Sequence, residues 1–166
     1  VAALLLRQRR ELTLAQSERA AQAERLRTLG LIDALVESSG DVIYAKDRDG
    51  RYLLFNAEAA RVTGHEAAAV LGRTDHALFP LAQADMLRAE DHQAMAGGGV
   101  TPREQVLDTA QGRRTFLSTK GPLRDADGRV IGVFGIARDV TERLEVQAVV
   151  AQQRELLEDM SRLAAI

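Results

Sequence analysis

The chain of 166 residues is long enough for one domain with a substantial hydrophobic core and additional helices, and its apolar content of 46% is typical of a folded protein. A formal net charge of only −2 argues against a dedicated nucleic-acid-binding protein, which normally presents a basic face, so we expect no nucleic-acid partner. Because the chain has no cysteine, disulfides, thiolate metal sites, cysteine nucleophiles and a flavin–cysteinyl adduct are all excluded.

Residues 1–30 predict one long helix, because no glycine or proline occurs between Leu4 and Leu29 and good helix formers dominate. A heptad of apolar residues can be drawn along this helix, but Arg19 interrupts the seam. Two interpretations stay open: a weak coiled coil, and a solvated connector helix that packs on its own domain.

The first ten residues, VAALLLRQRR, place an apolar run before three arginines. Arginines just inside a membrane span follow the positive-inside rule, so we expect the cytoplasmic end of an upstream transmembrane helix. The alternative is a helix that merely begins with leucines. On the first interpretation, the chain is a cytoplasmic domain of an inner-membrane protein.

Residues 31–39 predict a short helix that ends at Gly40, and strand pairs joined by glycine-containing turns follow. The expected strands are residues 41–47, 51–56, 104–109, 113–125 and 129–137. Helical segments are expected at residues 57–63, with Asn56 as N-cap, and at residues 65–72 and 81–96. This order predicts an α+β fold with helices on one face of an antiparallel sheet.

The strand at 129–137 is apolar on both faces, because alternation puts Val133 and Ala137 opposite Phe134 and Ile136. We therefore expect both faces of the sheet to be covered. The helical segments would cover one face, and a flanking helix or a second subunit the other.

Residues 141–166 predict a second long helix with a more regular apolar seam. Its a and d positions hold Val146, Val149, Leu156, Met160 and Leu163, with Gln153 as the polar exception. We expect this helix to continue beyond Ile166 and to form a coiled coil.

Three segments in this order and spacing, IYAKDRDGRYLLFN, VTGHEAAAVLGRTDHALFP and KGPLRDADGRVIGVFGIARDVTER, resemble a PAS domain, a sensory module of bacterial signalling proteins. The resemblance spans residues 32–144 and includes an Asp-x-Thr pattern at Asp139–Thr141. It implies a PAS-like five-stranded antiparallel sheet with a helical insert on one face and a pocket between them. We accordingly divide the chain into an N-terminal linker helix (1–30), a sensor domain (31–141) and a C-terminal signalling helix (142–166).

Enzyme chemistry has no support in the sequence. His65, His76 and His92 are far apart, and no pair has the i, i+4 spacing of a helical metal site. No Gly-x-Ser-x-Gly or Gly-x-x-x-x-Gly-Lys-Ser/Thr motif occurs. We predict no catalytic residue, no metal site and no cofactor. The resemblance implies that haem-binding relatives use a histidine on the long helix of the insert, but His92 has polar neighbours there and is predicted to face solvent.

Alternation places Phe116, Ser118 and Lys120 on one face of their strand, where Lys120 would suit a carboxylate ligand in the pocket. The alternative is that Lys120 extends its ammonium group to water at the end of the strand. The other candidates for the lining of this cavity, or for simple core packing, are Tyr44, Phe79 and Phe134.

Arg138, Asp139 and Thr141 mark the passage from the last strand into the C-terminal helix. Asp139 or Thr141 can cap that helix by accepting hydrogen bonds from its free N–H groups, and a carboxylate suits the positive end of the helix dipole. The resemblance implies in addition that Asp139 pairs with an arginine of the domain and so joins strand to helix. Capping alone is the simpler alternative.

The sequence therefore predicts a signal-transduction sensor module that senses a small polar or carboxylate ligand, or relays a conformational change through its C-terminal helix. The expected output domain is a histidine kinase, slightly favoured, or a diguanylate cyclase. The alternative is a ligand-free dimerisation and relay spacer, with a haem sensor third. We expect a homodimer through the flanking helices, and membrane contact only through an upstream transmembrane helix.

Overall fold

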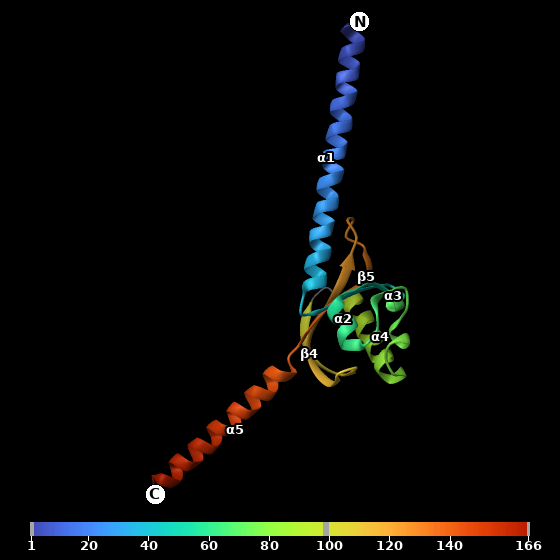
Figure 1. Ribbon diagram of the computed structural model, residues 1–166. Helices are drawn as coiled ribbons and strands as arrows, with labels where there is room; N and C mark the ends of the chain where they lie inside the picture. The colour runs from blue at the N-terminus through green and yellow to red at the C-terminus, as the bar shows by residue number, and fades with distance from the viewer. Residues whose placement is uncertain (1, 98–99, 166) are drawn as a thin grey trace. The chain divides into compact units, whose positions relative to one another are not determined.

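The computed structural model describes residues 2–97 and 100–165, and the chain divides after Ser38 into two units (Figure 1). The first unit is helix α1 (Ala2–Ser38), none of whose described residues is buried. Helix α1 continues through Gly30, where the sequence predicts separate long and short helices. One glycine inside a helix costs only about 0.5–1 kcal/mol relative to alanine, which good helix formers on both sides offset. No described helix is long and apolar enough to cross a bilayer.

The second unit is built on a five-stranded antiparallel sheet of order β2-β1-β5-β4-β3. The strands are β1 (Val42–Asp47), β2 (Tyr52–Phe55), β3 (Thr101–Thr109), β4 (Gly112–Arg124) and β5 (Val130–Asp139). This is the predicted α+β fold. Because β5 lies between β1 and β4, the strand that begins the sheet and the strand that leaves it are hydrogen-bonded neighbours.

Two of the predicted hairpin turns have the same local chemistry. Asp47 Oδ1 accepts hydrogen bonds of 2.9 Å from the N–H groups of residues 49 and 51, and Gly50 has a φ of 81°. Asp125 Oδ1 does the same for residues 127 and 129, with Gly128 at a φ of 81°. The aspartate side chain organises each turn, and only glycine adopts the left-handed conformation without strain.

The helical insert covers one face of the sheet (Figure 1). It consists of α2 (Ala57–Thr63), α3 (Ala67–Val70), the 3₁₀ helix η1 (Asp75–Ala77) and α4 (Leu81–Ala96). Beneath it, Tyr52, Phe55 and Val70 form one buried cluster, and Val62 and Phe116 belong to a second. The core therefore lies between the insert and the inner face of the sheet.

The outer face of the sheet carries apolar side chains that stay partly exposed. On β5, Ile136 pairs with Ile43 and Thr119, and 40% of its surface is exposed. Leu54 on β2 and Val106 on β3 are exposed as well. The insert covers one face as predicted, and a flanking helix or a second subunit stays the predicted cover of the other face, because alternation reveals an apolar face but not what lies against it.

Asn56 joins the start of the sheet to the start of the insert, and it is fully buried. Its Oδ1 accepts hydrogen bonds from the N–H groups of Ile43 and Ala59, both at 3.0 Å. Its Nδ2 donates to the carbonyl of Asp41 at 2.9 Å. The predicted N-cap of α2 is thus confirmed, and the same side chain also fixes β1.

We predict that Asn56→Ala lowers the free energy of unfolding by about 2–4 kcal/mol, because a helix cap and two further buried hydrogen bonds are lost together. Urea unfolding followed by circular dichroism measures this. Asn56→Ser, which keeps a capping oxygen, is expected to lose about 1 kcal/mol less. Glu66→Ala is the matched control, because Glu66 is the N-cap residue of α3 and makes no cap hydrogen bond. Equal stability of all three variants would contradict this role.

Candidate functional site

A buried ion pair network lies where the insert meets the sheet. Lys46 of β1 donates from Nζ to Asp75 Oδ2 at 2.6 Å and to Asp91 Oδ2 at 2.7 Å. All three side chains are at most 2% exposed. Since Asp75 belongs to η1 and Asp91 to α4, one ammonium group holds two parts of the insert against β1.

The remaining oxygens of the two aspartates are also satisfied. Tyr52 donates its hydroxyl hydrogen to Asp75 Oδ1 at 2.6 Å. Lys120 of β4 donates to Asp91 Oδ1 at 3.1 Å and also to Glu90 Oε2 at 2.9 Å. Buried charges without such partners are strongly destabilising, so the network depends on each of its charges having a partner.

The surroundings of the network shift the pKa values of its proton donors away from neutrality. Burial raises the pKa of Tyr52, and the Asp75 carboxylate beside it raises it further. Burial works to lower the pKa of Lys120, but Tyr44, Asp91 and Glu90 together raise it above its ordinary value. Proton transfer near pH 7 needs a group whose pKa lies near that pH, so Tyr52 and Lys120 are poor candidates for general acid–base catalysis.

The structure divides the six predicted pocket residues among three places. Those that line a cavity between insert and sheet are Tyr44, Phe79, Phe116 and Ser118. Ser118 also lines a separate polar hollow together with Lys120. Phe134 reaches neither, because its pairing with Ala45 and Gly121 puts it on the outer face.

The inner cavity has a volume of only about 60 Å³. Small-molecule pockets are usually about 300–1,000 Å³, so side chains already fill most of this space. Lys120 does not extend to water, because it is 12% exposed and holds two carboxylates. The sequence thus located the correct strand face and missed the ion pairs that occupy it.

Lys46, Asp75 and Asp91 were not predicted as site residues. Lys46 lies two residues after Tyr44, so strand alternation places both on the same face, and this was a usable signal. Its partners are 29 and 45 residues further along the chain. No local pattern connects residues so far apart.

The predicted junction residues lie where β5 passes into helix α5 (Thr141–Ala164). Thr141 Oγ1 accepts a hydrogen bond from the N–H of Thr115 at 2.9 Å, and the Thr115 carbonyl accepts one from Val140 at 2.9 Å. Asp139 Oδ1 accepts from the Thr141 N–H at 2.9 Å, and its other oxygen lies 3.8 Å from Arg114 Nη1. The N-cap residue of α5 is Val140, which makes no side-chain cap bond, and the Thr141 hydroxyl bonds to β4 instead of capping, so the prediction for Thr141 is wrong. Asp139 gives the first N–H of the helix its acceptor and adds a long ion pair.

Arg138 pairs with Asp41 and not with the residues that contact Asp139. Its Nε and Nη2 each donate to a carboxylate oxygen of Asp41 at 2.8 Å, in a bidentate pair. Asp41 immediately precedes β1, and Arg138 lies near the end of β5. This pair therefore connects the chain segment that enters the domain to the one that leaves it.

Two of the three histidines, His92 and His76, have exposed side chains. His92 on α4 is exposed, as predicted, and His76 Nε2 lies 2.7 Å from Asp85 Oδ1 at the surface. Within residues 2–97 and 100–165, no group of three His, Asp or Glu side chains is placed to hold a metal ion. Gly97 ends α4 and the predicted glycine stop continues into residues 98 and 99, which lie outside the described part of the chain.

We predict that Lys46→Met lowers the free energy of unfolding by about 3–5 kcal/mol, because it leaves buried carboxylates without their cation. In the double variant Lys46→Met/Asp75→Asn, the loss is expected to be smaller than the sum of the two single losses. Guanidinium unfolding measures both. The matched control Arg154→Met, which breaks an exposed ion pair with Glu158, should cost less than about 1 kcal/mol. Similar losses for Lys46→Met and Arg154→Met would show that the network does not hold the insert.

Solved structures with this fold include the PAS domain of Bordetella pertussis BvgS, with 24% identity and a TM-score of 0.61, covering 78% of this chain and 98% of that chain. The Vibrio cholera VqmA–ligand–DNA complex matches with 23% identity and a TM-score of 0.62, covering 75% of this chain and 57% of that chain. These identities concern the fold alone. The second structure still overturns the expectation of no nucleic-acid partner. Because this fold occurs in a chain that is bound to DNA, a low net charge is no ground for excluding nucleic acid.

The chain is 32% identical over 123 residues to the methanogenesis regulatory histidine kinase FilI of Methanothrix harundinacea, covering 74% of this chain and 14% of that protein. It is 28% identical over 120 residues to a diguanylate cyclase of Vibrio cholerae, covering 70% of this chain and 37% of that protein. The chain therefore spans less than half the length of these relatives. The family model described as the PAS fold matches residues 36–145, which is more than half of the chain. The chain belongs to the PAS family.

Proposed function

We propose that this PAS domain is the sensor and relay module of a larger signalling protein, in which a change in the domain alters α5 and, through it, an output domain. The observation that carries this proposal is the junction. One residue, Val140, separates β5 from α5, and the backbone of Thr115 on β4 is hydrogen-bonded to both Val140 and Thr141. A shift between β4 and β5 must therefore move the first turn of α5.

The surface of α5 supports a role in transmission. The apolar residues of its predicted seam are 54–71% exposed: Val146, Val149, Leu156, Met160 and Leu163. Burying each such side chain contributes about 1.5–3 kcal/mol, so an isolated α5 leaves much stabilisation unused. We propose that α5 forms a coiled coil with α5 of a second copy and carries the signal along it.

The relatives support the choice of output domain. The curated relatives include a histidine kinase at 32% identity and a diguanylate cyclase at 28% identity. A PAS sensor region homologous to theirs suits either output, and we favour the histidine kinase. Attachment to the cytoplasmic face of an inner membrane stays a prediction, argued only from the arginines at positions 7, 9 and 10.

A ligand-free relay is the second candidate, and the small inner cavity of about 60 Å³ favours it over a sensor with a ligand buried in the core. The same cavity volume and the exposed position of His92 do not favour a haem sensor. Colourless purified protein without a Soret band would exclude haem, while native mass spectrometry distinguishes a ligand-bound chain from an empty one.

We predict that Asp139→Ala costs about 1 kcal/mol of stability, the value of one capping bond, and leaves the domain folded. In the full-length protein, the stimulus-dependent change in output activity should fall by about 5-fold or more, the low end of typical coupling between sites. Hydrogen exchange should also be faster at the Thr141 amide. Asp127→Ala, in the exposed turn before β5, is the matched control. Normal signalling by Asp139→Ala would leave Asp139 only its capping role.

The Asp41–Arg138 pair gives a pH-dependent prediction. The two hydrogen bonds from Arg138 lower the pKa of Asp41 below its ordinary value, against the opposing effect of partial burial. A lowered carboxyl pKa stabilises the fold above the unfolded value of about 3.9, and this contribution is lost as the pH falls through the folded pKa. We predict that Arg138→Gln raises the pKa of Asp41, measured by NMR titration of its carboxyl carbon. The control variant Arg154→Gln should leave the pKa of Asp41 unchanged. An unchanged Asp41 titration in Arg138→Gln would mean that the pair does not form in solution.

A further inference from the structure

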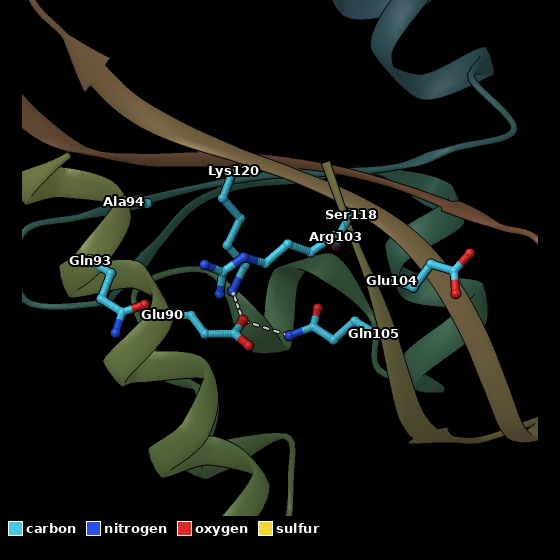
Figure 2. Close-up of a pocket in the computed structure, with 8 residues that line it drawn as sticks. All are labelled: Glu90, Gln93, Ala94, Arg103, Glu104, Gln105, Ser118 and Lys120. Carbon is cyan, nitrogen blue, oxygen red and sulfur yellow. Dashed lines mark hydrogen bonds and ion pairs between the residues drawn. The ribbon is translucent and has the colours of Figure 1, made fainter. Parts of the chain in front are cut away.

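A polar hollow opens between α4 and the strands β3 and β4 (Figure 2). Its volume is about 290 Å³, close to the lower limit of about 300 Å³ for small-molecule pockets. It is lined by Glu90, Gln93, Ala94, Arg103, Glu104, Gln105, Ser118 and Lys120. Unlike the inner cavity, the hollow has room for a ligand and a lining that is mainly polar.

Arg103 supplies a cation that the protein itself does not use. Its pairing with Ser118 puts its side chain on the inner face of the sheet, and Figure 2 shows its guanidinium beside Lys120. That guanidinium makes no hydrogen bond or ion pair with any residue in the described part of the chain. A guanidinium is always charged at neutral pH and binds carboxylates through two parallel N–H bonds.

Glu90 supplies a carboxylate, and both of its hydrogen bonds go to the same oxygen. Its Oε2 accepts from Lys120 at 2.9 Å and from Gln105 Nε2 at 2.5 Å (Figure 2). Its Oε1 has no partner among residues 2–97 and 100–165, and a quarter of the side chain is exposed. Lys120, in contrast, is committed to Glu90 and Asp91. The hollow thus presents a free guanidinium and a free carboxylate oxygen together.

The balance of charge defines the ligand. The network contains two lysines, Lys46 and Lys120, against Asp75, Asp91 and Glu90, and Arg103 brings the sum to zero. Glu104 adds a negative charge only at the rim, where it points away from the other side chains (Figure 2). A dianion would face Glu90, and a simple cation would face Arg103. A zwitterion satisfies both groups and adds no net charge.

From this arrangement we infer that the hollow binds a small zwitterion of the free amino acid class, with its carboxylate on Arg103 and its ammonium on Glu90. The inference rests on the proposed function and deepens it by naming the class of ligand that the sensor takes. Because the ammonium of the ligand and Lys120 both bind Glu90, occupancy of the hollow acts directly on the network that holds the insert.

The experiment uses the chain as described and needs no output domain, so its result is independent of whether α5 relays a signal. The twenty L-amino acids are screened by thermal shift, and affinities are measured by calorimetry at neutral pH. At least one amino acid is expected to raise the melting temperature, while its N-acetyl derivative and its amide do not. Arg103→Gln should weaken binding about tenfold or more, as expected for the loss of charge-assisted hydrogen bonds.

Two variants separate binding from folding. Arg113→Gln, at an exposed position of β4 outside the hollow, should bind as the unaltered chain does. Glu90→Gln should also weaken binding of the amino acid, because it removes the negative charge that holds the ammonium group of the ligand. Circular dichroism verifies that each variant is folded. The inference is overturned if no amino acid binds at millimolar concentration, if the N-acetyl derivative binds equally well, or if folded Arg103→Gln binds unchanged. In each case the Asp139→Ala experiment still tests the relay.

Discussion

The ammonium group of Lys46 is buried in the core, and an ion in such a place persists only where charged partners surround it. Its two aspartates come from η1 and α4, so the insert and the sheet have one mutual arrangement in which the charges are satisfied. Apolar packing alone would define that arrangement less sharply, because the buried apolar residues of α4 are only Ala84 and Leu87. We regard the network as the device that fixes the insert in register on β1.

Strand β4 connects this network to the exit of the domain. Lys120 near its end holds Asp91 and Glu90 of α4, and Thr115 holds the first turn of α5. Both contacts belong to one continuous strand, which pairs with β5 from Phe116 to Arg124. A displacement of α4 relative to the sheet therefore has a short physical route to α5. The Asp41–Arg138 pair makes a second connection, from the segment before β1 to the end of β5.

Features that depend on neighbouring residues could be predicted from the sequence. The aspartate–glycine turns, the Asn56 cap and the passage of β5 into α5 are local, and the fold follows from their order. The ion pairs could not be predicted, because Lys46 and Asp91 are 45 residues apart. Alternation set Phe134 opposite Val133, but which of the two faces the insert depends on the strand register, in which Val133 pairs with Lys46 and Phe134 with Ala45.

The small inner cavity and the polar hollow together suggest how a signal could begin. A ligand in the core would have to displace packed aromatic side chains, whereas a ligand at the hollow only has to compete for Glu90. Lys120 is paired with both Glu90 and Asp91. When its bond to Glu90 weakens, the ammonium group of Lys120 interacts mainly with Asp91. Asp91 in turn shares its carboxylate between Lys120 and Lys46. A change at the rim therefore alters the balance of charge on β1 and β4 without any ligand entering the core, since neighbouring ion pairs in a buried network are coupled.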